Sequence, residues 1–193
     1  MIQDSIFDEV HDCQETFRLL LYAISNPGEI VGIGKYARNL EDEDKIMLLL
    51  ALTLLDKETS FMVVGSNLLT KTAANLTYSK EREAYANFIF VAERCSPELM
   101  ENIFSKTTPG TLVEPHTNSV LIIGVDQFDQ SGSCLLKGPG INGCKRAALS
   151  GYARQWILLR DSIEYEYPTG IDLYFVTPQG ELMAIPRKVS MEG

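Results

Sequence analysis

The residues from Ser119 to Val125 form a nearly continuous apolar run, and this run constrains the fold more than any other part of the sequence. A strand without polar residues on either face is typical of a sheet that is covered on both sides. Such a sheet needs helices to cover it. We therefore expect an α/β protein built around a largely buried sheet.

Helical periodicity, capping residues and short apolar runs predict the remaining elements. The helices are expected at Cys13–Ser25, Glu41–Leu55, Asn67–Leu76, Ser96–Phe104 and Gly151–Ile163. For the first helix, Asp12 is the expected N-cap, and the Glu15 side chain is expected to accept from the Asp12 amide. The further strands are expected at Phe61–Val64, Phe88–Val91, Ser133–Lys137, Ile171–Val176 and Leu182–Ile185. The last two should form a hairpin through Pro178-Gln179-Gly180. This order predicts a mixed β-sheet flanked by helices, in a single domain over residues 1–193.

Charge and cysteine content exclude several classes of protein. The 193 residues carry a formal net charge of −9, which disfavours binding to nucleic acid. The N-terminus lacks the basic residues of a secretory signal, and the longest apolar run, Ile46–Leu55, is too short to cross a bilayer. We expect a cytoplasmic protein with no membrane contact. The cysteines lack metal-ligand spacing and are expected to be reduced and mostly buried; they are Cys13, Cys95, Cys134 and Cys144.

Three segments near the C-terminus join an apolar run to a Gly/Pro corner. They are Leu135–Ile141 (LLKGPGI), Tyr167–Val176 (YPTGIDLYFV) and Leu182–Arg187 (LMAIPR). Glycine permits close backbone approach, proline fixes φ, and corners of this kind at sheet ends build sites or interfaces. Ordinary turns are the alternative interpretation. The candidate ligand-binding or interface residues are Arg18, Lys137, Gly138, Pro139, Gly140, Asp172, Pro186 and Arg187.

The basic residues among these candidates indicate two alternatives. Arginine binds oxyanions through paired N–H groups, and a glycine turn adds backbone donors. The alternative interpretation, which we favour for any single one of these cations, is a surface charge or an ion pair that braces a corner. Asp172 lies inside a strand that should be buried, and a buried carboxylate needs a partner, which favours a brace over catalysis. The phosphate-loop and nucleophile-elbow motifs are incomplete. Gly138–Gly143 matches GxGxxG, but Pro139 and the position late in the chain do not suit a dinucleotide-binding βαβ unit, so we expect no catalytic residue, metal or cofactor.

Six segments, taken in order, resemble the H subunit of the carbon–phosphorus lyase system, the PhnH family. The first, Phe17–Gly28, is similar to the family's FRxLLxAxSxPG opening. The others are Leu54–Thr59, Glu114–Val125, Leu135–Ile141, Tyr167–Leu173 and Ala184–Arg187. The likeness spans nearly the whole chain, although residues 30–43 match weakly. Tyr167 stands where the family usually has Phe, and Lys188 where Thr is common.

The resemblance implies a role in bacterial phosphonate breakdown. In that system the G, H, I and L subunits together convert MgATP and an alkylphosphonate to ribose 1-phosphonate 5-triphosphate, and the I subunit resembles the nucleosidase. The resemblance also implies a homodimer that joins the G, I and J subunits, with L as a further candidate partner. Its fold would resemble a reduced pyridoxal-phosphate-dependent transferase that lacks the cofactor-anchoring lysine.

Two functional hypotheses follow from these observations. In the first, the chain is a non-catalytic assembly subunit of a transferase/lyase complex, inactive alone, and it should expose apolar surface that association buries. In the second, Arg18, Lys137 and Arg187 form a phosphonate or nucleotide pocket at the dimer interface. A pyridoxal enzyme is a third alternative, which would need an anchored Schiff base.

Overall fold

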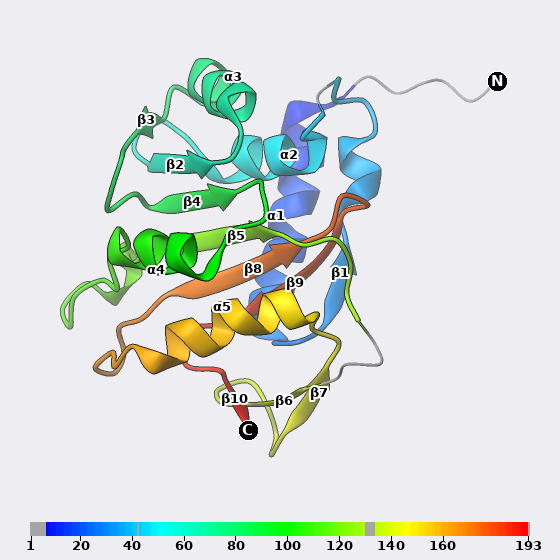
Figure 1. The fold of residues 1–193 in the computed structure, drawn as a ribbon. Helices are drawn as coiled ribbons and strands as arrows, with labels where there is room; N and C mark the ends of the chain where they lie inside the picture. The colour runs from blue at the N-terminus through cyan, green and yellow to red at the C-terminus, as the bar shows by residue number, and fades with distance from the viewer. Residues whose placement is uncertain (1–6, 42, 130–133, 193) are drawn as a thin grey trace.

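The computed structural model describes residues 7–41, 43–129 and 134–192, which form two sheets and the helices around them (Figure 1). The helices are α1 (Glu9–Ser25), α2 (Lys45–Leu54), α3 (Asn67–Thr77), α4 (Pro97–Ser105) and α5 (Gly151–Ser162), with 3₁₀ turns η1 (Gly34–Ala37) and η2 (Pro115–Thr117). The strands are β1 (Ile30–Gly32), β2 (Ser60–Val64), β3 (Lys80–Glu81), β4 (Phe88–Val91), β5 (Val120–Gly124), β6 (Cys134–Lys137), β7 (Lys145–Ala147), β8 (Asp172–Val176), β9 (Glu181–Ile185) and β10 (Ser190–Glu192).

The large sheet is mixed, as the sequence predicts. Its seven strands have the order β1-β9-β8-β5-β4-β2-β3. The strands from β8 to β3 are parallel to one another, whereas β9 runs antiparallel to β8 and to β1. The central strand β5 contains Leu121, Ile122 and Ile123, all with no exposed surface, which confirms that this apolar run is covered on both faces.

Two hydrophobic clusters lie on opposite faces of this sheet. The helices α1, α2 and α3 pack on one face, where Leu20, Leu49 and Leu69 are buried. On the other face, α4 and α5 pack with Ile103 and Trp156 buried, and they lie in front of the strands in Figure 1. The smaller antiparallel sheet, with the order β10-β6-β7, joins this second cluster through Leu136, Ala147 and Val189.

Most predicted helices are confirmed by their caps, but α1 begins earlier than expected. Ser96 and Ser150 accept hydrogen bonds from the first turns of α4 and α5. In α1 the N-cap is Asp8, which accepts from the His11 amide at 3.0 Å. Asp12 instead lies in the first turn and accepts from the Asp8 amide at 3.0 Å. The prediction of Asp12 as N-cap was wrong because Asp8 offers an equivalent cap one turn earlier.

The sequence did not predict the short strands β1, β3, β7 and β10. Each contains two or three residues, which is too short for a periodic pattern to emerge. The predicted strand Ser133–Lys137 is confirmed from Cys134 onward as β6, and Ser133 lies outside the described residues. Its partners β7 and β10 are far from each other in sequence, so only the folded chain brings them together.

All four cysteines are free thiols, and their burial differs from the expectation. Cys95 is buried, Cys13 and Cys134 are partly buried, and Cys144 is exposed. The prediction that most of them are buried was therefore wrong. Over the part of the chain that the structure describes, no helix combines the length and the apolar character needed to span a bilayer.

Candidate functional site

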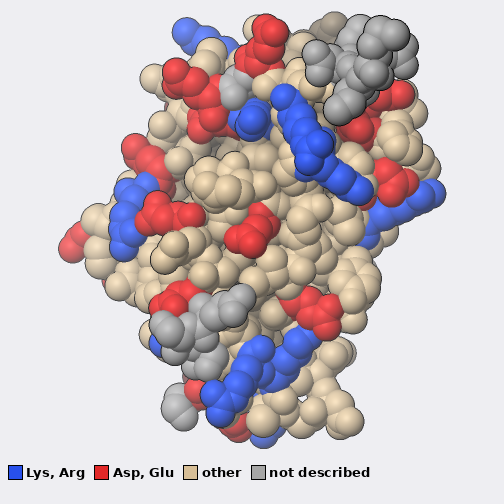
Figure 2. All heavy atoms as spheres, turned by 90° about the vertical axis from the view of Figure 1, so that its right-hand side faces the viewer, with Lys and Arg blue, Asp and Glu red and all other residues tan. Residues whose placement is uncertain are grey.

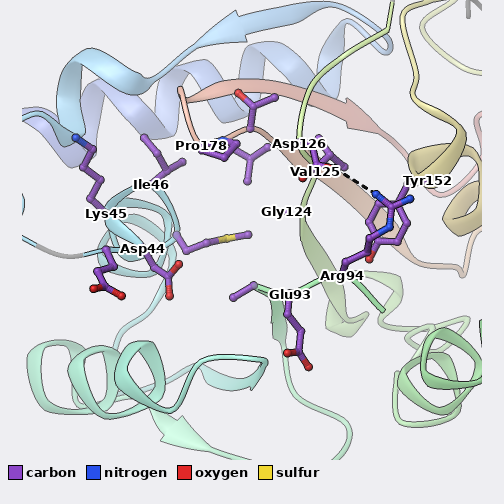
Figure 3. A pocket seen from close by; sticks show the side chains of 15 residues that line it. Asp44, Lys45, Ile46, Glu93, Arg94, Gly124, Val125, Asp126, Tyr152 and Pro178 are labelled. Atoms are coloured by element: carbon purple, nitrogen blue, oxygen red, sulfur yellow. Dashed lines mark hydrogen bonds and ion pairs between the residues drawn. The ribbon is translucent and has the colours of Figure 1, made fainter. Parts of the chain in front are cut away.

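A pocket of about 190 Å³ opens at the carboxyl ends of β4, β5 and β8 (Figure 3). Its walls are the residues that directly follow these strands, together with the first turn of α2. Open α/β sheets bind ligands beyond the carboxyl ends of their parallel strands. The topology therefore makes this pocket the first candidate for a functional site.

The floor of the pocket is apolar. Ile46 and Met47 come from α2, and Val125 and Val176 come from the ends of β5 and β8; all four are buried. A Cβ atom on Gly124 would lie 3.3 Å from the Met47 methyl carbon and 3.2 Å from the Val91 carbonyl oxygen. The glycine therefore lets Met47 lie close against the end of β5.

The rim of the pocket is charged and largely exposed. Arg94 donates to Asp126 at 3.2 Å, although the two side chains are 67% and 88% exposed. The Arg94 guanidinium also lies 4.7 Å from the centre of the Tyr152 ring. The Tyr152 hydroxyl accepts from the Cys95 amide at 3.0 Å, and burial raises the pKa of Tyr152. This hydroxyl therefore stays protonated and has a structural partner.

The charge balance of the rim disfavours an oxyanion. Its carboxylates are Glu43, Asp44, Glu93 and Asp126, and its cations are Lys45 and Arg94. Four acidic against two basic side chains make the local potential negative. Figure 2 shows the side of the molecule to which these strand ends point, and acidic and basic side chains are interspersed over it. A phosphonate or nucleotide would be repelled from this pocket.

The predicted residues Asp172 and Arg187 meet at the opposite, amino end of the same strands. The Arg187 guanidinium donates to Asp172 at 2.6 Å through Nη2 and at 3.1 Å through Nε, and the Arg187 amide donates to the same carboxylate at 2.7 Å. The guanidinium also donates to the Asn118 side chain at 2.8 Å and to the Pro115 carbonyl. This network ties β8, the end of β9 and the loop before β5 into one brace.

The second and third Gly/Pro segments meet at this brace, and the first packs on the two residues that follow the third. A Cβ atom on Gly170 would lie 3.0 Å from the Arg187 Cβ, so the second segment packs directly on the third. A Cβ atom on Gly138 would lie 2.8 Å from the Val189 Cα, and it would also collide with the Lys188 carbonyl oxygen. The Gly138 φ of 148° is one that other residues rarely adopt. The second and third corners therefore pack on each other, and the first packs on Lys188 and Val189, the residues that follow the third.

The structure places the remaining predicted residues elsewhere. Arg18 pairs with Glu15 at 2.6 Å on the exposed side of α1, and Lys137 pairs with Glu192 at 3.5 Å across β6 and β10. Pro139 is exposed in a turn, and Gly140 packs on Pro27. Arg18, Lys137 and Arg187 thus have three separate carboxylate partners. Their role in binding a ligand or a partner stays a prediction.

Sequence reasoning missed two groups of residues that line cavities. Glu93, Arg94 and Asp126 directly follow predicted strands, and the rule that ligands bind at strand ends would have indicated them. Arg160 lies on the buried face of α5 and is 1% exposed. It comes four residues after Trp156 and eight after Tyr152, which are buried on the same face. That spacing already predicts a buried arginine.

Several large apolar side chains are exposed along α1. Val10, Phe17, Leu21 and Tyr22 are 80%, 45%, 50% and 49% exposed. Val10, Phe17 and Leu21 are seven and four residues apart, so they lie on one side of the helix. The buried side of the helix, about a third of a turn around from this face, packs on the protein core through Leu20 and Ala23. α1 therefore has one apolar face inside the protein and a second apolar face outside it.

Comparison with known proteins identifies relatives over almost the entire chain. Residues 5–192 match the protein family described as "Bacterial phosphonate metabolism protein (PhnH)". The chain is also 25% identical to the "Putative C-P lyase subunit protein HtxG" of Stutzerimonas stutzeri over 176 residues, which cover 90% of this chain and 83% of that protein. Among the described residues, no group of three or more His, Cys, Asp or Glu side chains is arranged to hold a metal ion.

Proposed function

Because the chain belongs to the PhnH family of bacterial phosphonate metabolism proteins, we propose that it is a non-catalytic assembly subunit of a carbon–phosphorus lyase complex. The complex would form ribose 1-phosphonate 5-triphosphate from MgATP and an alkylphosphonate in the cytoplasm, and the reacting groups would lie on another subunit. The partners would be a second copy of this chain and the G, I and J subunits. The likeness to a reduced pyridoxal-phosphate-dependent transferase belongs to the same proposal.

The observation that supports an assembly role is the outer apolar face of α1. Monomeric proteins seldom expose several large apolar side chains side by side, because association or aggregation would bury them. Phe17, Leu21 and Val10 provide such a face on a regular helix. A helix that is apolar on two sides is suited to pack on its own sheet and on a partner at the same time.

The test is co-expression with the G, I and J subunits, followed by purification through a tag on one of those subunits. We expect the parent chain to co-purify, and we expect a Phe17→Asp/Leu21→Asp variant to be lost from the complex and to be monomeric by light scattering. A matched control is Leu68→Asp/Leu76→Asp, which changes two leucines of similar exposure, 54% and 53%, on α3. Thermal unfolding of both variants checks that each still folds.

Two results would contradict the assembly role. One is that the purified chain converts MgATP and methylphosphonate without any other subunit. The other is that both α1 substitutions leave co-purification and the dimer unchanged.

A further inference from the structure

A groove on the α4–α5 side of the protein changes along its length from apolar to cationic. One part, of about 380 Å³, lies between α4 and α5 and is lined by Phe104, Leu159 and Ile163. The other part, of about 210 Å³, is lined by Arg160, Arg187 and Lys188. Ile163 and Tyr165 line both parts, so the two adjoin at these side chains. We propose that this groove binds a phosphonate or phosphate with an apolar substituent, with the oxyanion at Lys188 and the substituent along Ile163 and Leu159.

The cationic end holds two fixed arginines and Lys188, and these three cations outnumber the two carboxylates that pair with the arginines. The Arg160 guanidinium donates to Asp161 at 2.8 Å and to the Ile185 and Pro186 carbonyls at 3.2 Å each. Arg187 is held by Asp172, as described above. Their hydrogen bonds leave the arginines little freedom to turn toward a ligand. Their role in the groove is therefore electrostatic, and a third side chain must make the direct contact.

Lys188 is the side chain suited to that contact. Its Nζ donates to the Tyr165 carbonyl at 3.1 Å, and an ammonium group has three N–H donors, so it can serve a ligand as well. Partial burial, and then repulsion by Arg187 and Arg160, lower the pKa of Lys188. An oxyanion beside it would offset that repulsion. The two carboxylates in this region, Asp161 and Asp172, already accept hydrogen bonds from the arginines.

The apolar part of the groove begins next to this lysine. Phe104 is 5% exposed, while Leu159 and Ile163 are partly exposed and form its wall. Burial raises the pKa of the neighbouring Tyr165, in agreement with a dry environment. A ligand with a charged head and an alkyl chain would therefore satisfy both parts of the groove. A doubly charged phosphonate gains more from the cationic end than a singly charged carboxylate does.

The experiment is calorimetry on the purified full chain with methyl-, ethyl-, propyl- and butylphosphonate at constant pH and ionic strength. Each added methylene should tighten binding about fourfold while the groove has room. Lys188→Met should weaken binding of every member about tenfold or more, as expected for loss of a hydrogen bond to a charged group. Lys71→Met, an exposed lysine on α3, is the matched control and should leave binding unchanged.

A second pair of variants tests the apolar end. Ile163→Asn should remove most of the dependence on chain length, whereas Leu158→Asn, on the same helix and 58% exposed, should not. Butyl phosphate in place of butylphosphonate distinguishes esters from phosphonates, and butyrate should bind more weakly than either. Thermal unfolding checks that each variant is folded. Lys188→Gln is used in place of Lys188→Met if that variant does not fold.

Equal affinities for the parent chain and Lys188→Met, or affinities independent of chain length, would overturn this inference. The inference rests on the proposed function only for the choice of phosphonates as probes. Binding is measured on the isolated chain and assembly by co-purification. A negative result in the binding experiment therefore does not contradict the assembly role, and a negative result in co-purification does not contradict phosphonate binding.

Discussion

The two ends of the central sheet differ in how their charged residues are held. At the carboxyl ends of the strands, Arg94 and Asp126 form one ion pair with side chains that are 67% and 88% exposed. At the amino ends, Arg187 and Asp172 are 22% and 12% exposed and share a network with Asn118 and a backbone carbonyl. The end that topology favours for a ligand is open and acidic. The end that the Gly/Pro corners form is closed, and its neighbouring groove is cationic.

The comparison shows that the sheet topology and the distribution of charge indicate different ligand sites in this protein. A cavity at the carboxyl ends follows from parallel strands and short loops, whatever the residues are. The affinity of a cavity for an oxyanion depends on the charges that line it. Here those charges are negative at the carboxyl ends and positive in the groove beside the brace.

The largest expected effect comes from Arg187→Met. This variant leaves the Asp172 carboxylate, which is 12% exposed, without its cation, and removal of one partner from such a pair costs about 3 kcal/mol of unfolding free energy. Arg94→Met is the counterpart at the other end and should cost less than about 1 kcal/mol, since its pair is exposed. Urea unfolding of both variants measures the difference. Equal losses would show that the two ends are held with similar strength.

The next effect concerns packing at the brace. Gly138→Ala should cost roughly 3 kcal/mol, because it combines an unfavourable φ with a collision against the backbone of Lys188 and Val189. Gly143→Ala is the matched control: its φ is 78° and its Cβ would have no atom within 4 Å. It should cost only about 1 kcal/mol. If unfolding experiments give the same loss for both, the collision at Gly138 is relieved by movement of the corner.

A smaller effect is expected from Tyr152→Phe at the carboxyl end. The hydroxyl accepts from the buried Cys95 amide at 3.0 Å, and its removal leaves that donor without a partner, at a cost of about 1–2 kcal/mol. Amide hydrogen exchange at Cys95 should become faster in the same variant. Tyr78→Phe, at a tyrosine that is 75% exposed, is the control and should have no effect. Unchanged exchange at Cys95 would mean that this end of the sheet does not depend on the hydroxyl.

The smallest effect on stability should come from Glu29→Gln. This variant removes an exposed ion pair away from both ends of the sheet, and it serves as a reference for the pairs at those ends. Glu29 accepts from Lys145 at 2.9 Å and from Tyr22 at 2.7 Å, and these donors lower its pKa, with Lys145 the larger cause. A carboxylate with a lowered pKa stabilises the folded state above its unfolded pKa, and this contribution is lost as the pH falls through the lowered value. The variant should therefore be slightly less stable than the parent at neutral pH and equal to it in acid. Glu164→Gln, which also removes one charge, controls for the change in net charge.

Local signals in the sequence predicted much of the fold. Ser96 followed by Pro97 predicted the start of α4, and the run of aliphatic residues predicted β5 as the buried centre of the sheet. The prediction of a partner for Asp172 is confirmed by the brace with Arg187. The likeness to the PhnH family is confirmed over residues 5–192.

Long-range contacts explain what the sequence did not predict. The groove beside Lys188 needs α4, α5 and the turn after β9 to meet, and these elements are separated by tens of residues. The structure pairs Arg18, Lys137 and Arg187 with three different carboxylates. Their spacing along the chain contains no information on which carboxylate each cation meets in the fold.

The sequence by itself determined where the α-helices and the longer strands lie, which serine caps α4, and to which family the chain belongs. Those properties depend on residues that are close together along the chain, or on their order. The tertiary structure alone decided that Gly170 packs on Arg187 and Gly138 on Val189, and that the acidic pocket and the cationic groove lie at opposite ends of one sheet. Charge and burial at a site are sums over neighbours in space, and only the folded chain defines those neighbours.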